Sequence, residues 1–370
     1  MHNFLTTPIR FLVFLAFVFG IFYLANTDQS GEITESEVAG SLPELKEIPL
    51  STNGENRGYG NLVFVQPVLS SSHYYSEEIF LNSIRPYFEK AKEAKIIDKK
   101  TVFILPEHIG SFLAFHHGNR FVYEAETFEK AIQELRKYKK LESAISDENL
   151  KKSFYAHFSE EAAEIYSRIF SKLAQEYSVP IVAGSIILKN PKVINGKIKI
   201  TEGDLLNASF VFLPDGNVYP NFLEKTILSQ WEKEFITPGS IYKDKLIVLP
   251  SWKLGVLISM ESFYPISYSS IRGRAVDSLV SINAISKQNF FPENFEGIST
   301  SDPNSSLELL KTKGISEKVS LSSSPNFGEV FLRGKFWNLE WMGESFTKRN
   351  LKDVDETNDK DRARLLNLYF

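Results

Sequence analysis

Residues 255–265 read GVLISMESFYP, in which a short apolar run ends at Ser259 and leads into a turn that contains Glu261. The apolar run has the character of a buried β-strand. A helix over residues 264–274 and another strand over residues 276–283 (VDSLVSIN) are predicted to follow. This order of strand, helix and strand is typical of a layered α/β domain with its helices on the outside.

Strands and helices are predicted to alternate upstream of this stretch as well. A helix between two apolar runs makes a βαβ unit, and a later Pro-Asp-Gly turn between two strand-like runs indicates a β-hairpin. The predicted elements are strands over residues 61–66 (NLVFVQ), 101–107 (TVFILPE) and 179–188 (VPIVAGSIIL), helices over residues 76–94 and 160–177, and the hairpin over residues 207–228.

The composition of the 370-residue chain excludes several kinds of chemistry. The chain has no cysteine, and therefore no disulfide, no thiolate metal site and no thiol nucleophile. Its net charge of -4, with acidic and basic residues mixed along the chain, provides no broad positive field for nucleic acid. Six histidines without an H-E-x-x-H motif give a metal site little to build on. We therefore expect no nucleic-acid partner, no metal and no cofactor.

The N-terminal segment is predicted to lie in a membrane. Residues 11–25 (FLVFLAFVFGIFYLA) are uninterrupted apolar sequence, preceded by Arg10 and followed by polar and acidic residues. The run is short for a spanning helix of about 20 residues and fits the upper end of a signal-peptide core of about 7–15 residues. The bulky Tyr23 does not suit a cleavage site after Ala25, which favours an uncleaved anchor. Because the next basic residue is Lys46, the rest of the chain is expected to face away from the cytosol.

Four segments are predicted along the chain. A signal anchor or transmembrane segment occupies residues 1–25, a flexible linker 26–59, a globular domain 60–346 and a charged C-terminal tail 347–370. The linker is rich in Gly, Ser and Glu and has no sustained periodicity. The tail ends in apolar residues, which could pack on this subunit, pack on a partner or fray.

Three polar residues lie at the ends of predicted strands. Glu107 follows TVFILP, Lys225 lies in FLEKTIL, and Ser259 follows GVLI. Taken singly, each has an ordinary explanation: a carboxylate that meets water, a solvated charge on an edge strand, and a small residue before a turn. Only their order and context together point to a site.

In order and context these residues resemble the nitrilase superfamily of carbon-nitrogen hydrolases. The stretch LPEHIGSFL resembles its glutamate motif, NASFVFLPDGNVYPNFLEKTILSQWEKEF its lysine region, and GVLISMESFYP its G-x-x-I-C-x-E-x-x-x-P elbow. The resemblance implies that Glu107 is a general base, that Lys225 stabilises a tetrahedral intermediate, and that Glu232 is an additional active-site glutamate. Ser259 stands where the family has its cysteine nucleophile. The resemblance further implies a four-layer αββα sandwich and a homodimer.

Ser259 is a poor substitute for a cysteine nucleophile. A thiol ionises near neutral pH when it is paired with a base, whereas a hydroxyl is far less acidic, and serine hydrolases activate it with a histidine held by a carboxylate. His108 is adjacent to Glu107, but neighbours on an extended chain point to opposite faces, so His108 is not expected to serve. No G-x-S-x-G motif surrounds Ser259, which argues against an α/β-hydrolase elbow.

The sequence leaves the question of enzymatic activity open among three readings. The favoured one is a nitrilase-like domain that binds an amide, a nitrile, an acyl compound or a protein partner and turns over slowly or not at all. The second is an active amidohydrolase or N-acyltransferase with Ser259 as nucleophile. A nitrilase-like domain outside the membrane resembles apolipoprotein N-acyltransferase, but that enzyme has several membrane helices, whereas one is predicted for this chain. The third is a non-catalytic scaffold held at the membrane.

Overall fold

The computed structural model describes residues 31–45, 47–286, 313–321, 324, 326–350 and 362–370, together with short strands at 294–295, 298–299 and 352–353. The membrane segment predicted over residues 11–25 lies outside this range. Among the helices of the described residues, none combines the length and the apolar character that crossing a bilayer requires.

The first six-stranded sheet is built around the predicted βαβ unit. Its strand order is β1-β21-β2-β4-β5-β8, and its centre is formed by the parallel neighbours β2, β4 and β5. Every residue of β2 and β4 is buried, as expected for central parallel strands covered on both faces. The strands are β1 (Leu50–Asn53), β2 (Asn61–Gln66), β4 (Thr101–Ile104), β5 (Ile181–Val182), β8 (Val211–Phe212) and β21 (Arg364–Tyr369).

The second six-stranded sheet contains the stretch GVLISMESFYP. Its strand order is β10-β11-β12-β16-β19-β20, with β11, β12 and β16 parallel to one another. The parallel register brings the carboxyl ends of β11 and β12 together, because Ile258 pairs with Ile282. The strands are β10 (Leu246–Leu249), β11 (Trp252–Ile258), β12 (Ser278–Asn283), β16 (Phe327–Phe331), β19 (Phe346–Arg349) and β20 (Lys352–Asp353).

The two sheets pack face to face through a shared apolar layer. Leu62 and Phe64 of the first sheet belong to the same buried cluster as Val256 and Val280 of the second. The sheets approach closely at Gly328, where a Cβ atom would lie 2.2 Å from the ring of Phe64. A glycine is therefore needed at this crossing, since any larger side chain would overpack the core.

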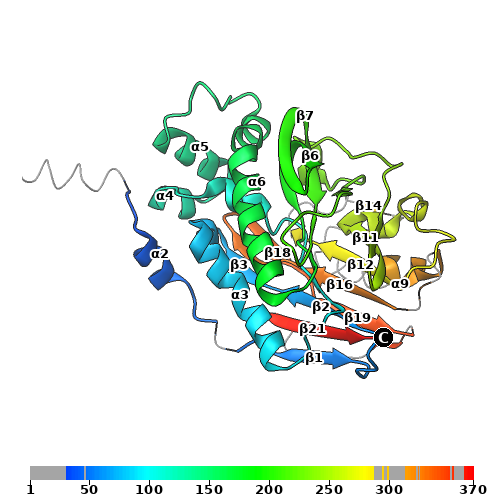
Figure 1. Cartoon of the computed structure of the whole chain (residues 1–370). Helices are drawn as coiled ribbons and strands as arrows, with labels where there is room; N and C mark the ends of the chain where they lie inside the picture. Colours follow the sequence, from blue (N-terminus) through cyan, green and yellow to red (C-terminus); the bar gives the residue numbers. More distant parts are fainter. Residues whose placement is uncertain are drawn as a thin grey trace, which may run out of the picture.

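Two long helices cover the outer face of the first sheet. Figure 1 shows α3 (Glu77–Glu93) and α6 (Leu150–Tyr177) lying side by side over this sheet. Buried side chains of both helices share one cluster with residues of β2 and β4. The other helices of the described residues are short: α2 (Glu35–Ser41), α4 (Arg120–Tyr123), α5 (Phe128–Tyr138), α7 (Gln230–Lys233), α9 (Ile315–Lys318), and 3-10 helices η1 (Ser71–Tyr74), η2 (Ser111–Phe115), η3 (Ser259–Phe263), η4 (Pro265–Tyr268) and η5 (Val319–Leu321).

The helix predicted over residues 264–274 is not a regular α-helix. It is replaced by η4 and a series of turns, while α9 supplies Ile315 to the same outer cluster. Serine hydroxyls in this segment compete with helical hydrogen bonds, and the Oγ of Ser270 accepts a bond from the backbone N–H of Lys245. The order of layers is helix, sheet, sheet and helix, as predicted. In the described residues, the layer outside the second sheet consists only of short helices and turns.

The hairpin predicted over residues 207–228 is only partly present. β7 (Lys197–Ser209) pairs mainly with β6 (Ile186–Ile194) in a long hairpin, and only its end pairs with β9 (Leu223–Glu224). The Pro-Asp-Gly turn closes a single bridge between Phe212 and Val218. A further small sheet joins β3 (Val68–Ser70), β13 (Ile285–Ser286), β17 (Arg333–Phe336) and β18 (Leu339–Met342), and β14 (Asn294–Phe295) pairs with β15 (Ile298–Ser299).

The linker and the tail predicted at the two ends of the domain both contribute strands to the first sheet. β1 lies within residues 26–59, and β21 lies within residues 347–370. β21 lies between β1 and β2, close to the C-terminus in Figure 1. All of its residues are buried, so the apolar end of the chain packs on its own subunit. The domain therefore extends beyond the predicted boundaries at residues 60 and 346.

Candidate active site

Glu107 is a buried carboxylate just beyond the end of β4. It is fully buried, and its Oε1 accepts hydrogen bonds from Lys225 Nζ at 2.7 Å and Asn207 Nδ2 at 3.0 Å. Its Oε2 accepts a bond of 3.0 Å from the backbone N–H of Ala284, which follows β12. Three donors from different elements therefore hold Glu107 between the ends of the two sheets.

Lys225 lies between two carboxylates. Its Nζ contacts Glu107 Oε1 and, at 2.5 Å, Glu232 Oε2. Burial alone lowers the pKa of the Lys225 ammonium, but the two carboxylates outweigh it and the pKa is raised above the usual lysine value. Lys225 is thus a fixed cation at the site.

Glu232 lies at the start of the short helix α7. Its Oε2 also accepts bonds of 2.8 Å from the backbone N–H and the hydroxyl of Ser229, the residue that caps the helix. Burial raises the pKa of the Glu232 carboxyl, yet Lys225 and then His108 reverse the effect and hold this pKa far below the usual range. Glu232 therefore stays ionised at neutral pH.

Ser259 occupies a strained turn immediately after β11. Its backbone has a φ of 54°, in the left-handed region that residues other than glycine rarely adopt. The side chain is fully buried, and its Oγ makes no hydrogen bond to any described residue. An unpaired hydroxyl in a buried, strained turn is the kind of feature that clusters at functional sites.

Glu261 connects the Ser259 turn to the loop of Lys225. Its Oε2 accepts a bond of 2.9 Å from the backbone N–H of Ile258, and its Oε1 accepts bonds from the backbone and hydroxyl of Thr226. Lys245 Nζ completes the set at 2.6 Å from Oε1. Because Ile258 precedes Ser259 and Thr226 follows Lys225, this carboxylate ties the two segments together.

His108 does not point away from the site, and the expectation that it would is wrong. The alternation of side chains holds only on an extended chain, and His108 has a φ of 57°, which turns its ring back toward Glu107. Its Nε2 lies 3.4 Å from Glu232 Oε1 and 3.8 Å from Glu107 Oε1. Asn207, part of the motif but not singled out as a site residue, also bridges both carboxylates, with its Nδ2 2.8 Å from Glu232 Oε1.

The cluster resembles a cation site that already holds its cation. Glu107, His108 and Glu232 each offer a ligand atom, and these atoms lie within 4.8 Å of one another. The Lys225 ammonium contacts both carboxylates, so it supplies the positive charge that a metal ion would bring.

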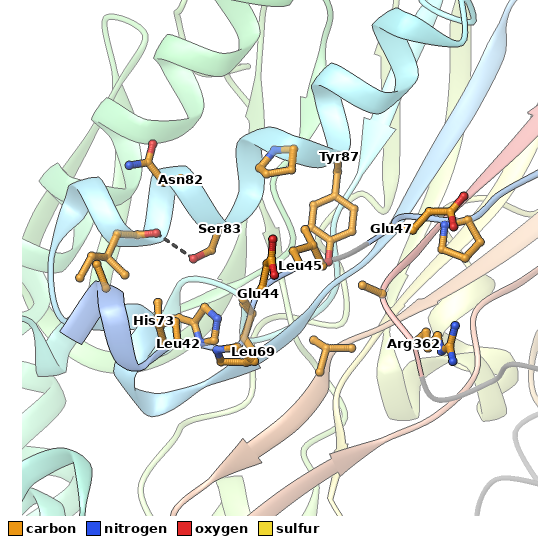
Figure 2. Close-up of a pocket in the computed structure, with 17 residues that line it drawn as sticks. Leu42, Glu44, Leu45, Glu47, Leu69, His73, Asn82, Ser83, Tyr87 and Arg362 are labelled. Carbon is orange, nitrogen blue, oxygen red and sulfur yellow. Dashed lines mark hydrogen bonds between the residues drawn. The ribbon is translucent and has the colours of Figure 1, made fainter. Parts of the chain in front are cut away.

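The described surface also has cavities that the cluster of Glu107, Lys225 and Glu232 does not line. One of about 210 Å³ borders the Ser259 turn, since it is lined by Thr226, Met260 and Tyr264 among others. Another of about 780 Å³ lies between residues 39–45 and α3, and Figure 2 labels Tyr87 and Leu45 among the side chains that line it. None of the cluster residues lines this second cavity.

The three residues expected to form the site are brought together to different degrees. Glu107 and Lys225 are in direct contact, and Glu232 joins them. Ser259 lies just beyond the end of β11, beside the end of β12, and Glu261 ties its turn to the loop of Lys225. The arrangement offers a fixed cation, an oriented carboxylate and a hydroxyl, the groups needed to bind and attack a carbonyl compound.

Solved structures that share this fold include carbon-nitrogen hydrolases and amidases of the nitrilase superfamily. A carbon-nitrogen hydrolase from Helicobacter pylori G27 has a TM-score of 0.52 and 16% identity, over 84% of this chain and 88% of that one. The amidase from Nesterenkonia sp. AN1, as a double mutant in complex with acrylamide, has a TM-score of 0.54 and 11% identity, over 85% and 92%.

A mutant of the Nesterenkonia AN1 amidase in which a cysteine is replaced by serine has a TM-score of 0.53 and 12% identity, over 85% of this chain and 92% of that one. No family model matches the sequence, and no curated protein matches it significantly. The chain therefore has the fold of the carbon-nitrogen hydrolases of the nitrilase superfamily, the family that its sequence motifs resemble.

Proposed function

We propose that this chain is a membrane-tethered nitrilase-like protein whose site binds a small amide, nitrile or acyl compound and hydrolyses it slowly or not at all. The observation that carries this proposal is the buried cluster of Glu107, Lys225 and Glu232 beside the strained turn of Ser259. Such a costly arrangement of buried charges is typical of functional sites.

The cluster suits a polar carbonyl compound. The Lys225 ammonium is a donor for an oxygen that gains negative charge as a carbonyl is attacked, and burial strengthens such an interaction. Glu107 is oriented by three donors, and the Lys225 ammonium is one of them. The complex of the Nesterenkonia amidase with acrylamide supports an amide as the first ligand to test.

The nucleophile limits the rate. A cysteine thiol has a pKa near 8.5 and ionises readily beside a base, whereas the Ser259 hydroxyl is far less acidic. The Ser259 Oγ has no hydrogen-bonded histidine among the described residues to take its proton, unlike the nucleophile of a serine hydrolase. We therefore infer binding with weak turnover, or none.

A serine-dependent amidohydrolase is the second candidate, and one observation favours it. The left-handed turn at Ser259 holds the hydroxyl unpaired, as an attacking group would be held.

Ser259→Ala separates these two functions. We expect native protein and Ser259→Ala to bind acrylamide or acetamide with the same affinity in calorimetry, because Lys225 and Glu107 make the polar contacts. Hydrolysis of the same amides, followed by ammonia release, should be slow or at background for native protein and at background for Ser259→Ala. If the native protein turns an amide over rapidly and Ser259→Ala does not, Ser259 is an efficient nucleophile and the weak-turnover proposal fails. Absence of binding to native protein would also contradict it.

We further propose that residues 26–370 lie outside the cytosol, tethered by residues 11–25. Arg10 precedes the apolar run, and no basic residue follows it before Lys46. Protease added to cells with a permeabilised outer layer should digest the domain, while a cytosolic control protein stays intact. Protection of the domain under conditions that spare the control would contradict this orientation.

A further inference from the structure

The chain is attached to the domain from Gly31 onward. The carbonyl oxygen of Gly31 accepts a hydrogen bond of 2.7 Å from the backbone N–H of Arg120. The carbonyl oxygen of Ile33 accepts one of 2.7 Å from the hydroxyl of Tyr75. Val38 of α2 is 1% exposed and forms a small apolar cluster with Tyr75. The segment predicted to be a flexible linker is therefore held on the domain at these points.

The stretch between this attachment and the apolar run is short. Only residues 26–30 separate Gly31 from the run over residues 11–25. A fully extended chain spans at most about 3.6 Å per residue, so Gly31 lies within roughly 22 Å of the last residue of the run. With residues 11–25 in a membrane, as proposed above, the surface around Gly31 lies close to that membrane.

Two exposed aromatic side chains belong to the surface around Gly31. Phe121 of α4 is 40% exposed and lies against Gly31, where a Cβ atom would be 2.6 Å from its ring. Tyr138 at the end of α5 is 39% exposed and lies near Tyr75, since burial and then Tyr138 raise the pKa of Tyr75 above its usual value. The helices α4 and α5 pack against one another, and Figure 1 shows both near α2. Aromatic side chains are typical of membrane interfaces.

Three cations belong to the same surface. Arg120, Lys137 and Lys140 are exposed, and none of them makes a salt bridge to another described residue. Carboxylates beside them are already paired: Glu126 with Lys130, Glu129 with Lys151, and Asp147 with Arg136. Basic side chains next to a membrane segment favour anionic lipid headgroups.

We propose that the surface formed by Arg120, Phe121, Lys137, Tyr138 and Lys140 docks on an anionic membrane, so that the domain lies with this face on the bilayer that tethers it. The aromatic rings enter the headgroup region, and the three cations meet lipid phosphates. The inference rests on the proposed tether and adds to it the docked face and the lipid chemistry.

The lack of cysteine allows docking to be measured with single labels. Phe121→Cys and Tyr138→Cys each carry one nitroxide in the full chain, in nanodiscs of phosphatidylcholine mixed with phosphatidylglycerol. Val248→Cys is the matched control, because Val248 is 44% exposed on the edge strand β10 of the second sheet. The measurement compares collisions of the nitroxide with oxygen, which concentrates in lipid, and with a water-soluble nickel chelate. Oxygen should dominate at positions 121 and 138, and the nickel chelate at position 248.

Charge reversal tests the lipid chemistry. A lysine near an anionic surface contributes on the order of fivefold to binding, so Lys137→Glu with Lys140→Glu should lower the ratio of docked to undocked domain by at least about tenfold. The label at position 121 should then report water. Lys197→Glu with Lys199→Glu makes the same charge change on exposed residues of β7 and should leave the docking unchanged. Nanodiscs of phosphatidylcholine alone should weaken the docking of native lysines in the same way.

The outcomes separate the docked face from the tether. Labels at positions 121 and 138 that behave like the label at 248, in protein that has entered the nanodiscs, would overturn the docking and leave the tether standing. A chain that does not enter nanodiscs would overturn both. Docking that persists in Lys137→Glu with Lys140→Glu, or that is equally strong without phosphatidylglycerol, would show that anionic lipid is not the partner. None of these readouts depends on amide binding or turnover.

Discussion

Ser259→Cys is expected to create or greatly raise hydrolysis of simple amides and activated esters. The substitution exchanges one γ atom for a larger one in a turn that is already formed, and it supplies a nucleophile that ionises near neutral pH beside Glu107 and Lys225. We expect a gain on the order of 10²- to 10⁴-fold over native protein, the range that a well-placed base contributes. The measurement is initial rates on a panel of amides, nitriles and activated esters.

The double variant Ser259→Cys with Glu107→Gln is the matched control for this gain. Glutamine keeps the shape of the side chain and leaves the Lys225–Glu232 pair in place, but it cannot take a proton from the thiol. Activity should return to background in the double variant. An active double variant would show that Glu107 is not the base, and an inactive single variant would show that more than the thiol is missing.

Lys225→Met is expected to destabilise the fold strongly. The Lys225 ammonium is the cation between two fully buried carboxylates, and its removal leaves them facing one another without compensation. Breaking a buried ion pair on one side costs about 3–5 kcal/mol. The free energy of unfolding from urea denaturation should fall by this order.

The loss in Lys225→Met should depend on pH with a definite sign. In native protein the lowered pKa of Glu232 contributes stability that is present above the unfolded pKa and lost as pH falls through the folded one. Without Lys225, one buried carboxyl must take up a proton to fold, so the variant should lose stability as pH rises above about 4.5, the usual glutamate range. A variant as stable as native protein, or one with the same pH dependence, would contradict this account.

Two further variants separate charge from packing in this prediction. Lys225→Met with Glu232→Gln should recover part of the lost stability, because one of the opposed charges is gone. Lys130→Met removes a lysine from an exposed pair with Glu126 and should change the free energy of unfolding by less than about 1 kcal/mol.

The site could be predicted from the sequence to the extent that it depends on local order. Apolar runs of strand length end at Glu107 and Ser259, and the resemblance to the nitrilase superfamily adds Lys225 and Glu232, which lies in the first turn of α7. Contacts join Glu107, Lys225 and Glu232 in one cluster, and their roles in catalysis stay predictions. The turn of the hairpin between β6 and β7 also has a sequence signal, the Asn195-Gly196 pair between two strand-like runs.

His108 shows why the remaining site residues were not predictable. Its orientation depends on one left-handed residue, which is stabilised by Ser185 and Ser111 and packed by Trp231 and Trp341. These partners come from separate elements and carry no local pattern. The alternation rule is correct for strands, but the residue lies just past the end of one.

The sequence alone determined the central βαβ elements, the strand-end residues and the absence of a thiol, because these follow from apolar periodicity and residue identity along the chain. Only the tertiary structure decided that the two ends of the domain share its first sheet, with Asn61 paired to Tyr369 and Leu50 to Leu365. It also decided that His108 joins the carboxylates. Both outcomes rest on contacts between residues distant in sequence, whose pairing energy no local stretch encodes.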